Sequence, residues 1–201
     1  MLAMSAGLNK ADPYPLAASP ADVQMAVGIL RRGGVIAYAT ESCFGLGCDP
    51  SNARAIRRLL AIKRRSYRKG LILIAGNIQQ IKQFTDMRNL PYNDAITQSW
   101  PGPNTWLVPP TKQVSQWVRG RHARVAVRVT AHDGAASLCH AFGGALISTS
   151  ANWSGQDTLR NYFAVQQTLG RQLDFVLPGN IGRATKPSVI RDGVSGEILR
   201  E

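Results

Sequence analysis

Residues 19–41 read SPADVQMAVGILRRGGVIAYATE and hold a helix, a stop and a strand in direct succession. Ser19 can cap the helix with its hydroxyl, and Pro20 suits the first helical position. The two glycines at 33–34 end that helix. The apolar run at 35–39 is typical of a strand buried on both faces. A helix that feeds directly into such a strand predicts an α/β fold.

The same alternation continues along the rest of the chain. Because the last strands are hairpin-like, we expect one twisted mixed sheet flanked by helices. No linker or repeat divides residues 19–201, which predicts a single domain, and residues 1–18 are expected to form a loose tail. Further helices are predicted from Asp49-Pro50 to about Lys63, after Asn77, at 133–142 and near 158–169, and further strands at 71–75, 124–129, 145–149, 173–177, 188–191 and 197–200.

The composition is basic and poor in cysteine. The chain has 201 residues, with 24 Lys and Arg against 12 Asp and Glu, which gives a net charge of +12. Such an excess favours nucleotides, RNA or an anionic membrane surface as partners, unless it serves solubility alone. Cys43, Cys48 and Cys139 form no even framework and lack a second metal-ligand pair, which predicts reduced thiols and no zinc site. Because no apolar run is long enough to span a membrane and no secretory signal is recognisable, we expect a cytoplasmic protein.

One stretch is unusually rich in positive charge. Between Arg54 and Lys69 the chain has eight basic residues and no acid. The arginines before Lys63 lie opposite the apolar stripe of the predicted helix, which favours a solvated helix face. Those from Lys63 to Lys69 crowd a loop, where a ligand with several negative charges would relieve their repulsion.

Polar residues within or directly after three predicted strands are candidate ligand contacts. Ser150 and Asn152 follow one strand and offer neutral hydrogen-bonding groups. Thr40-Glu41 follows another, where open α/β sheets place ligands. Arg128 lies opposite the valines of 124–129, either as a surface residue on an edge strand or as a partner for a carboxylate or phosphate in a cleft.

The familiar nucleotide-binding and nucleophile motifs are missing from the sequence. There is no phosphate-binding loop of the G-x-x-x-x-G-K-[ST] type, and Gly45-Leu46-Gly47 lacks the third glycine of a dinucleotide fingerprint. Paired carboxylates and a Ser/His/Asp order are missing as well. If the chain is an enzyme, it must therefore act by positioning and electrostatics.

Seven motifs together resemble the YrdC-like family, and they occur in the family's order over about residues 20–200. Any one of them is weak evidence, but their order is highly specific. They are Thr40-Glu41-x-x-Phe44-Gly45-Leu46-Gly47, Lys63-x-Arg65, Lys69-Gly70-Leu71-Ile72-Leu73-Ile74, Trp100-Pro101-Gly102-Pro103-x-Thr105, Val125-Ala126-Val127-Arg128-Val129, Ser148-Thr149-Ser150-Ala151-Asn152-x-Ser154-Gly155 and Pro187-Ser188-x-Ile190-x-Asp192.

The resemblance implies a twisted α/β sheet around a large basic cavity, and a nucleotidyltransferase reaction. L-threonine, bicarbonate and ATP would give threonylcarbamoyl-AMP and pyrophosphate, when the oxygen of a carbamate formed on threonine attacks the α-phosphate. A divalent cation, Mg²⁺, would assist with the phosphates. Proteins of a threonylcarbamoyl transferase complex would then use the product to modify adenosine 37 of tRNAs. Longer relatives carry a further C-terminal domain that acts as a lid.

The resemblance also assigns roles to residues. Lys63 and Arg65 are the expected catalytic residues, and no side chain is expected to bind a metal. Arg128 would hold the carboxylate of threonine. The ATP-binding residues would be Lys63, Arg65, Lys69, Arg124, Ser150, Asn152 and Arg200, and the threonine-binding residues Thr40, Arg128, Ser148 and Ser188.

Two other functions stay open at this point. The chain could be a non-catalytic RNA-binding maturation factor that uses the same basic cavity. It could also be a hydrolase or carbamoyl transferase that acts on another carbamoyl adenylate. For any of these functions, the enzyme included, the charge of +12 predicts weak, salt-sensitive binding to tRNA.

Overall fold

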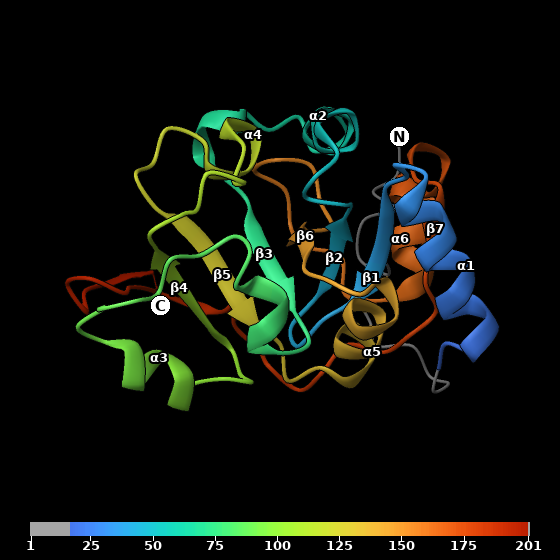
Figure 1. Ribbon diagram of the computed structural model, residues 1–201. Coiled ribbons are helices and arrows are strands. Elements are labelled where there is room, and N and C mark those ends of the chain that lie inside the picture. The colour runs from blue at the N-terminus through green and yellow to red at the C-terminus, as the bar shows by residue number, and fades with distance from the viewer. Residues whose placement is uncertain (1–16, 201) are drawn as a thin grey trace.

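The computed structural model describes residues 17–200, in which nine strands form one sheet (Figure 1). The strand order across the sheet is β7-β1-β2-β6-β3-β5-β4-β8-β9. The predicted tail falls mostly on residues 1–16, which lie outside the described residues. The strands are β1 (Ile36–Ala39), β2 (Phe44–Gly47), β3 (Ile72–Ala75), β4 (Asn104–Val108), β5 (Val125–Val129), β6 (Leu146–Ser150), β7 (Phe175–Val176), β8 (Val189–Asp192) and β9 (Ile198–Arg200).

Six α-helices and three short 3₁₀ turns connect these strands within residues 17–200. Neighbouring strands β1/β7, β3/β5 and β4/β8 run parallel, whereas β1/β2, β2/β6, β3/β6, β4/β5 and β8/β9 run antiparallel. The predicted mixed α/β sheet is confirmed. The helices are α1 (Pro20–Arg31), α2 (Ala53–Ile62), α3 (Asn93–Gln98), α4 (Gln116–Arg119), α5 (Asp133–Phe142) and α6 (Tyr162–Leu169), and the 3₁₀ turns are η1 (Tyr67–Lys69), η2 (Ile78–Ile81) and η3 (Gly170–Gln172).

Local side-chain chemistry fixes where the helices begin. In α1 the Asp22 backbone N–H donates to the Ser19 hydroxyl over 3.2 Å, while the Ser19 N–H donates to the Asp22 carboxylate over 2.8 Å. This reciprocal capping confirms the predicted start. The predicted start of α2 at Asp49-Pro50 is wrong, because Asn52 caps that helix by accepting from the Ala55 N–H over 3.0 Å.

Other boundaries differ from the prediction for similar reasons. The helix expected after Asn77 is only the single turn η2, and the helix expected from residue 158 begins at Tyr162 after the Asn161 cap. Strand β2 was not predicted from the sequence. Its Gly47 packs so closely that an added Cβ would lie 2.6 Å from the Tyr38 ring. The strand therefore requires glycine at this position, although glycine usually disfavours strands.

The sheet is covered on both faces by apolar helices. On one face α1 and α5 pack against Ile36, Tyr38 and Ile74. On the other face α2 packs against the alternate residues, such as Ala37 and Leu73. Across residues 17–200, no helix is both long enough and apolar enough to cross a membrane. The three cysteines are free thiols.

Candidate active site

A cavity of about 420 Å³ lies over the part of the sheet that α1 and α5 leave uncovered. Alternate residues of β5 explain how the sheet builds it. Val125, Val127 and Val129 point into the apolar core, whereas Ala126 and Arg128 line the cavity, as the alternation predicted. The strands therefore supply a rigid floor for this site.

The wall of the cavity is strongly basic. Among residues 17–200, no Asp or Glu side chain lines it. Burial, and then the nearby Arg200, lower the pKa of Arg65, while burial, and then Arg128, lower that of Arg200. Each of these guanidinium groups therefore lacks a compensating anion in the cavity, which suits an anionic ligand. The basic lining residues are Arg65, Lys69, Arg119, Arg124, Arg128, Arg160 and Arg200.

The structure brings most of the predicted site residues to this one cavity. All of them line it except Lys63 and Asn152, which lie behind its wall. Residues from six separate segments of the chain thus meet at one place. The predicted residues in the lining are Thr40, Arg65, Lys69, Arg124, Arg128, Ser148, Ser150, Ser188 and Arg200.

Lys63 has a structural environment of its own. Its side chain is buried, with only 2% of the residue exposed, and its ammonium donates to the Ser150 carbonyl, to the Asn152 carbonyl over 3.0 Å and to Asn152 Oδ1 over 2.8 Å. Burial, and then the charge of Arg65, lower the pKa of Lys63 from 10.5 to about 8. The Ser150 hydroxyl also donates to Asn152 Oδ1. The motif that contains Lys63 and the motif that contains Ser150 and Asn152 are therefore joined directly, and Lys63 fixes the turn after β6.

The end of α2 explains how Lys63 and Arg65 point to different places. The Arg64 N–H donates to the Ala61 carbonyl and the Arg65 N–H to the Leu60 carbonyl, both over 2.9 Å. This pair of bonds is a Schellman motif, which reverses the chain sharply. Lys63 consequently points inward to the turn, and Arg65 points into the cavity, where its guanidinium donates to the Gly70 carbonyl over 3.1 Å.

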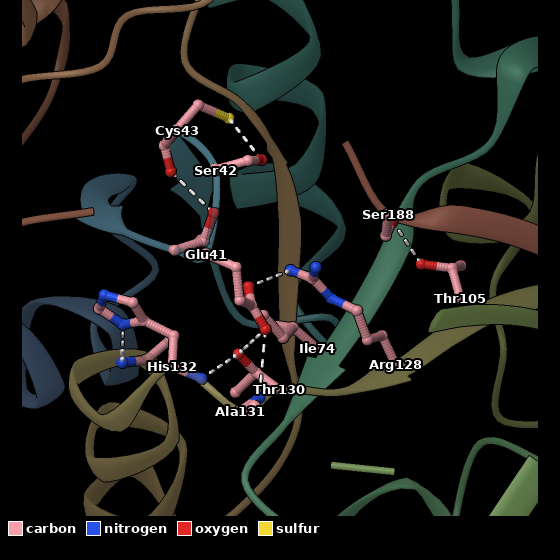
Figure 2. A network of polar contacts seen from close by, with 12 residues as sticks. Glu41, Ser42, Cys43, Ile74, Thr105, Arg128, Thr130, Ala131, His132 and Ser188 are labelled. Atoms are coloured by element: carbon pink, nitrogen blue, oxygen red, sulfur yellow. Dashed lines mark hydrogen bonds and ion pairs between the residues drawn. The ribbon is translucent and has the colours of Figure 1, made fainter. Parts of the chain in front are cut away.

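Arg128 forms an ion pair at the floor of the site (Figure 2). Its guanidinium lies 3.2 Å from the Glu41 carboxylate, and both side chains are almost fully buried. The other Glu41 oxygen accepts from the Thr130 hydroxyl over 2.7 Å and from the Ala131 N–H over 3.1 Å. Because β5 lies between β3 and β4, the interpretation of Arg128 as a surface residue on an edge strand is wrong. Arg128 Nε has no hydrogen-bond partner within residues 17–200.

The C-terminal strands close the far side of the cavity. Arg200 donates to the Ser188 carbonyl over 2.7 Å, and the Ser188 hydroxyl lies 2.8 Å from that of Thr105. Arg124 forms an ion pair with Asp192, which is itself buried. The hydroxyls and guanidinium groups on this side are thus held in place before any ligand arrives.

Two basic residues of the site, Arg119 and Arg160, were not predicted from the sequence. Arg119 ends α4 and Arg160 lies in the irregular segment before α6, and both line the cavity. The run from 95 to 132 contains no acid, and this could have indicated Arg119. Nothing in the local sequence distinguishes Arg160. Within the described part of the chain, no three His, Cys, Asp or Glu side chains cluster closely enough to hold a metal ion.

The sequence of residues 28–201 matches the Sua5/YciO/YrdC family, which is described as telomere recombination. The chain belongs to this family. A member from Methylococcus capsulatus, named threonylcarbamoyl-AMP synthase, is 46% identical over 178 residues, which cover 89% of this chain and 96% of the relative. A second protein of that name, from Chromobacterium violaceum, is 50% identical over 171 residues, which cover 85% and 88% of the two chains. The expected family membership is confirmed.

Solved structures of the family share the fold. P. abyssi Sua5 in complex with L-threonine superposes with a TM-score of 0.78 at 26% identity, covering 85% of this chain and 50% of Sua5. This chain thus spans about half of that longer protein. E. coli YciO superposes with a TM-score of 0.79 at 24% identity, covering 93% and 94% of the two chains.

Proposed function

We infer that this chain is a threonylcarbamoyl-AMP synthase, a nucleotidyltransferase that serves the threonylcarbamoyladenosine modification of tRNA. Its substrates are ATP, L-threonine and bicarbonate, and its products are threonylcarbamoyl-AMP and pyrophosphate. Relatives of that name match nearly their whole length at 46–50% identity. The observation that carries the inference on the structural side is a cavity with seven cationic side chains and, within residues 17–200, no carboxylate in its wall.

The basic wall provides a place for the triphosphate of ATP. Arg65, Lys69, Arg124 and Arg200 converge there, with the Ser150 hydroxyl beside them. A carbamate oxygen on threonine attacks the α-phosphate, a new P–O bond forms, and the bond to the β-phosphate bridging oxygen breaks to release pyrophosphate. Fixed cations stabilise the negative charge that spreads over the phosphate oxygens in this step.

Lys63 and Asn152 act behind this wall. Their mutual hydrogen bonds fix the turn that presents the Ser150 hydroxyl, so their primary contribution is to position it. The ammonium of Lys63 adds a positive charge next to Arg65. Because the described residues offer no metal-ligand cluster, the Mg²⁺ that we expect would be held by the phosphates of ATP.

Threonine would occupy the neighbouring part of the cavity. Arg128 would hold its carboxylate through two parallel hydrogen bonds, and the hydroxyls of Thr40, Ser148 and Ser188 would surround the rest. The Thr40 hydroxyl already donates to the Cys43 carbonyl over 2.7 Å, so it would accept from the ligand. P. abyssi Sua5 has been solved with L-threonine, which supports an amino-acid subsite in this fold.

Pyrophosphate release tests this function. We expect release from ATP only when both L-threonine and bicarbonate are present. Release that depends on neither would contradict the proposal. We also expect the enzyme to work in the cytoplasm, where it meets tRNA and the proteins of the transferase complex.

A non-catalytic RNA-binding role is the second candidate, and the net charge of +12 favours it. Such a protein would bind RNA without consuming ATP. The same assay separates the two roles, because only the enzyme releases pyrophosphate.

A further inference from the structure

Half of the positive charge of this chain lies in two short segments. Residues 54–69 and 112–124 together contain 12 of the 24 Lys and Arg residues and none of the 12 Asp and Glu residues. In the fold these segments form α2, η1 and α4, which lie together at one end of the molecule, at the top of Figure 1. This end is therefore much more basic than the average surface, and the catalytic cavity accounts for only part of the charge.

A groove of about 410 Å³ opens on the outer side of these elements. Arg57, Arg64, Tyr67 and Trp117 line it. Arg65 also borders the groove and is the one described residue that it shares with the catalytic cavity. The groove is thus a separate, open site on the far side of the loop that follows α2.

Aromatic rings and guanidinium groups contact one another in this groove and beside it. The Arg57 guanidinium lies 5.8 Å from the centre of the Trp117 ring, and that of Arg64 lies 5.1 Å from the centre of the Trp153 ring. The Tyr67 and Trp117 rings lie 5.2 Å apart at 60°. Both arginines are exposed, so their outer planes remain open to a further flat group.

The backbone at Arg64 indicates that this side chain has a role outside the fold. Arg64 has a φ of 51°, in the left-handed region that glycine adopts without cost. It occupies the position after the α2 cap where Schellman motifs usually have glycine. Glycine at this position would therefore stabilise the fold at least as well as arginine does. The position nevertheless holds an arginine, which stacks over Trp153.

We propose that the groove lined by Arg57, Arg64, Tyr67 and Trp117 binds a single-stranded stretch of RNA. Bases stack on aromatic rings and on guanidinium planes, and Arg and Lys neutralise the phosphates between them. The positive charge of the groove favours a polyanion as its ligand. The aromatic rings and guanidinium planes favour unpaired bases, which can stack on them. The choice of RNA rests on the proposed role in tRNA modification.

The test measures the affinity of the full chain for a labelled, unstructured RNA of 15 nucleotides, by fluorescence anisotropy over a series of salt concentrations. We expect Trp117→Ala to weaken binding about tenfold without changing the salt slope, because a stacked base is lost. We expect Arg64→Gly to weaken binding and to reduce the salt slope by about 0.7, the value for one phosphate contact on a single strand. Trp117→Phe should restore most of the affinity.

Two further variants serve as matched controls. Lys82→Ala removes one exposed charge, and Phe163→Ala removes one exposed aromatic ring, both outside the groove. We expect both to bind RNA within about twofold of the unaltered chain. Arg64→Gly should melt no lower than the unaltered chain, and Trp117→Ala should release pyrophosphate at the unaltered rate, which keeps this test separate from that of the proposed function.

Three results would overturn the proposal. One is unchanged RNA affinity in both Arg64→Gly and Trp117→Ala. Another is an equal loss in the two control variants, which would mean diffuse electrostatic binding. The third is tighter binding of an RNA duplex of the same length, since paired bases cannot stack in the groove.

Discussion

Lys63→Met removes an ammonium group whose three hydrogen bonds hold the turn from Ser150 to Asn152. Hydrogen bonds from a charged donor contribute about 1.5–3 kcal/mol each before the cost of burial. Burial, and then the charge of Arg65, oppose the ammonium and lower the pKa of Lys63 from 10.5 to about 8, which corresponds to a cost on the order of 3 kcal/mol. The turn is only partly buried, so water can reach the freed carbonyls. Three such bonds less this cost leave about 1.5–6 kcal/mol, and because water reaches the turn we expect a loss near the lower end in the free energy of unfolding.

Urea unfolding, followed by circular dichroism, measures this loss directly. Arg54→Ala is the control, since it removes a charge from the exposed face of α2 and should change stability by less than about 0.5 kcal/mol. ATP affinity, measured by calorimetry on the folded variant, should fall as well, because the Ser150 hydroxyl is no longer held. An unchanged unfolding free energy together with a hundredfold loss of ATP affinity would refute this reasoning. It would make Lys63 a phosphate ligand rather than the residue that fixes the turn.

Three further results are expected. Arg65→Ala should weaken ATP binding about ten- to a hundredfold, as expected for a lost charge-assisted contact, and Arg57→Ala should not; equal small effects in calorimetry would contradict the assignment. Arg128→Lys should impair threonine binding and leave ATP binding intact, because lysine cannot form two parallel hydrogen bonds; a loss confined to ATP would reverse the two subsites. ATP affinity should fall as the pH rises through about 8, since Lys63 is charged only below its pKa. If Lys63 causes this fall, the ATP affinity of Lys63→Met should not change over the same pH range.

Patterns with a strong local cause were predictable from the sequence. The cap at Ser19, the apolar strand β1 and the alternation in β5 each follow from neighbouring residues, and all three are present. The alternation even gave the correct side for Arg128. The position of Arg128 within the sheet was not predictable, because the strand order depends on pairing between residues far apart in sequence.

The role of Lys63 in the site could likewise be predicted only in part from the sequence. Its sequence position in a basic loop indicated a phosphate contact, and that contact remains a prediction. The structure adds the hydrogen bonds to Ser150 and Asn152, which bridge some 87 residues of sequence. That turn lies beside α2 only when β6 pairs with β2, through Ser150 with Gly45 and Thr149 with Leu46. No local sequence pattern predicts this pairing. The ion pair between Arg128 and Glu41 was unpredictable for the same reason.

The identity of the adenylate product tests the central claim most directly. The chain is incubated with ATP, ¹⁵N-labelled L-threonine and ¹³C-labelled bicarbonate, and the nucleotide products are resolved by mass spectrometry. We predict a threonylcarbamoyl-AMP that carries both labels, formed in equal amount with pyrophosphate, and almost none from Arg65→Ala. A product that carries only one label, or unmodified AMP alone, would contradict the account.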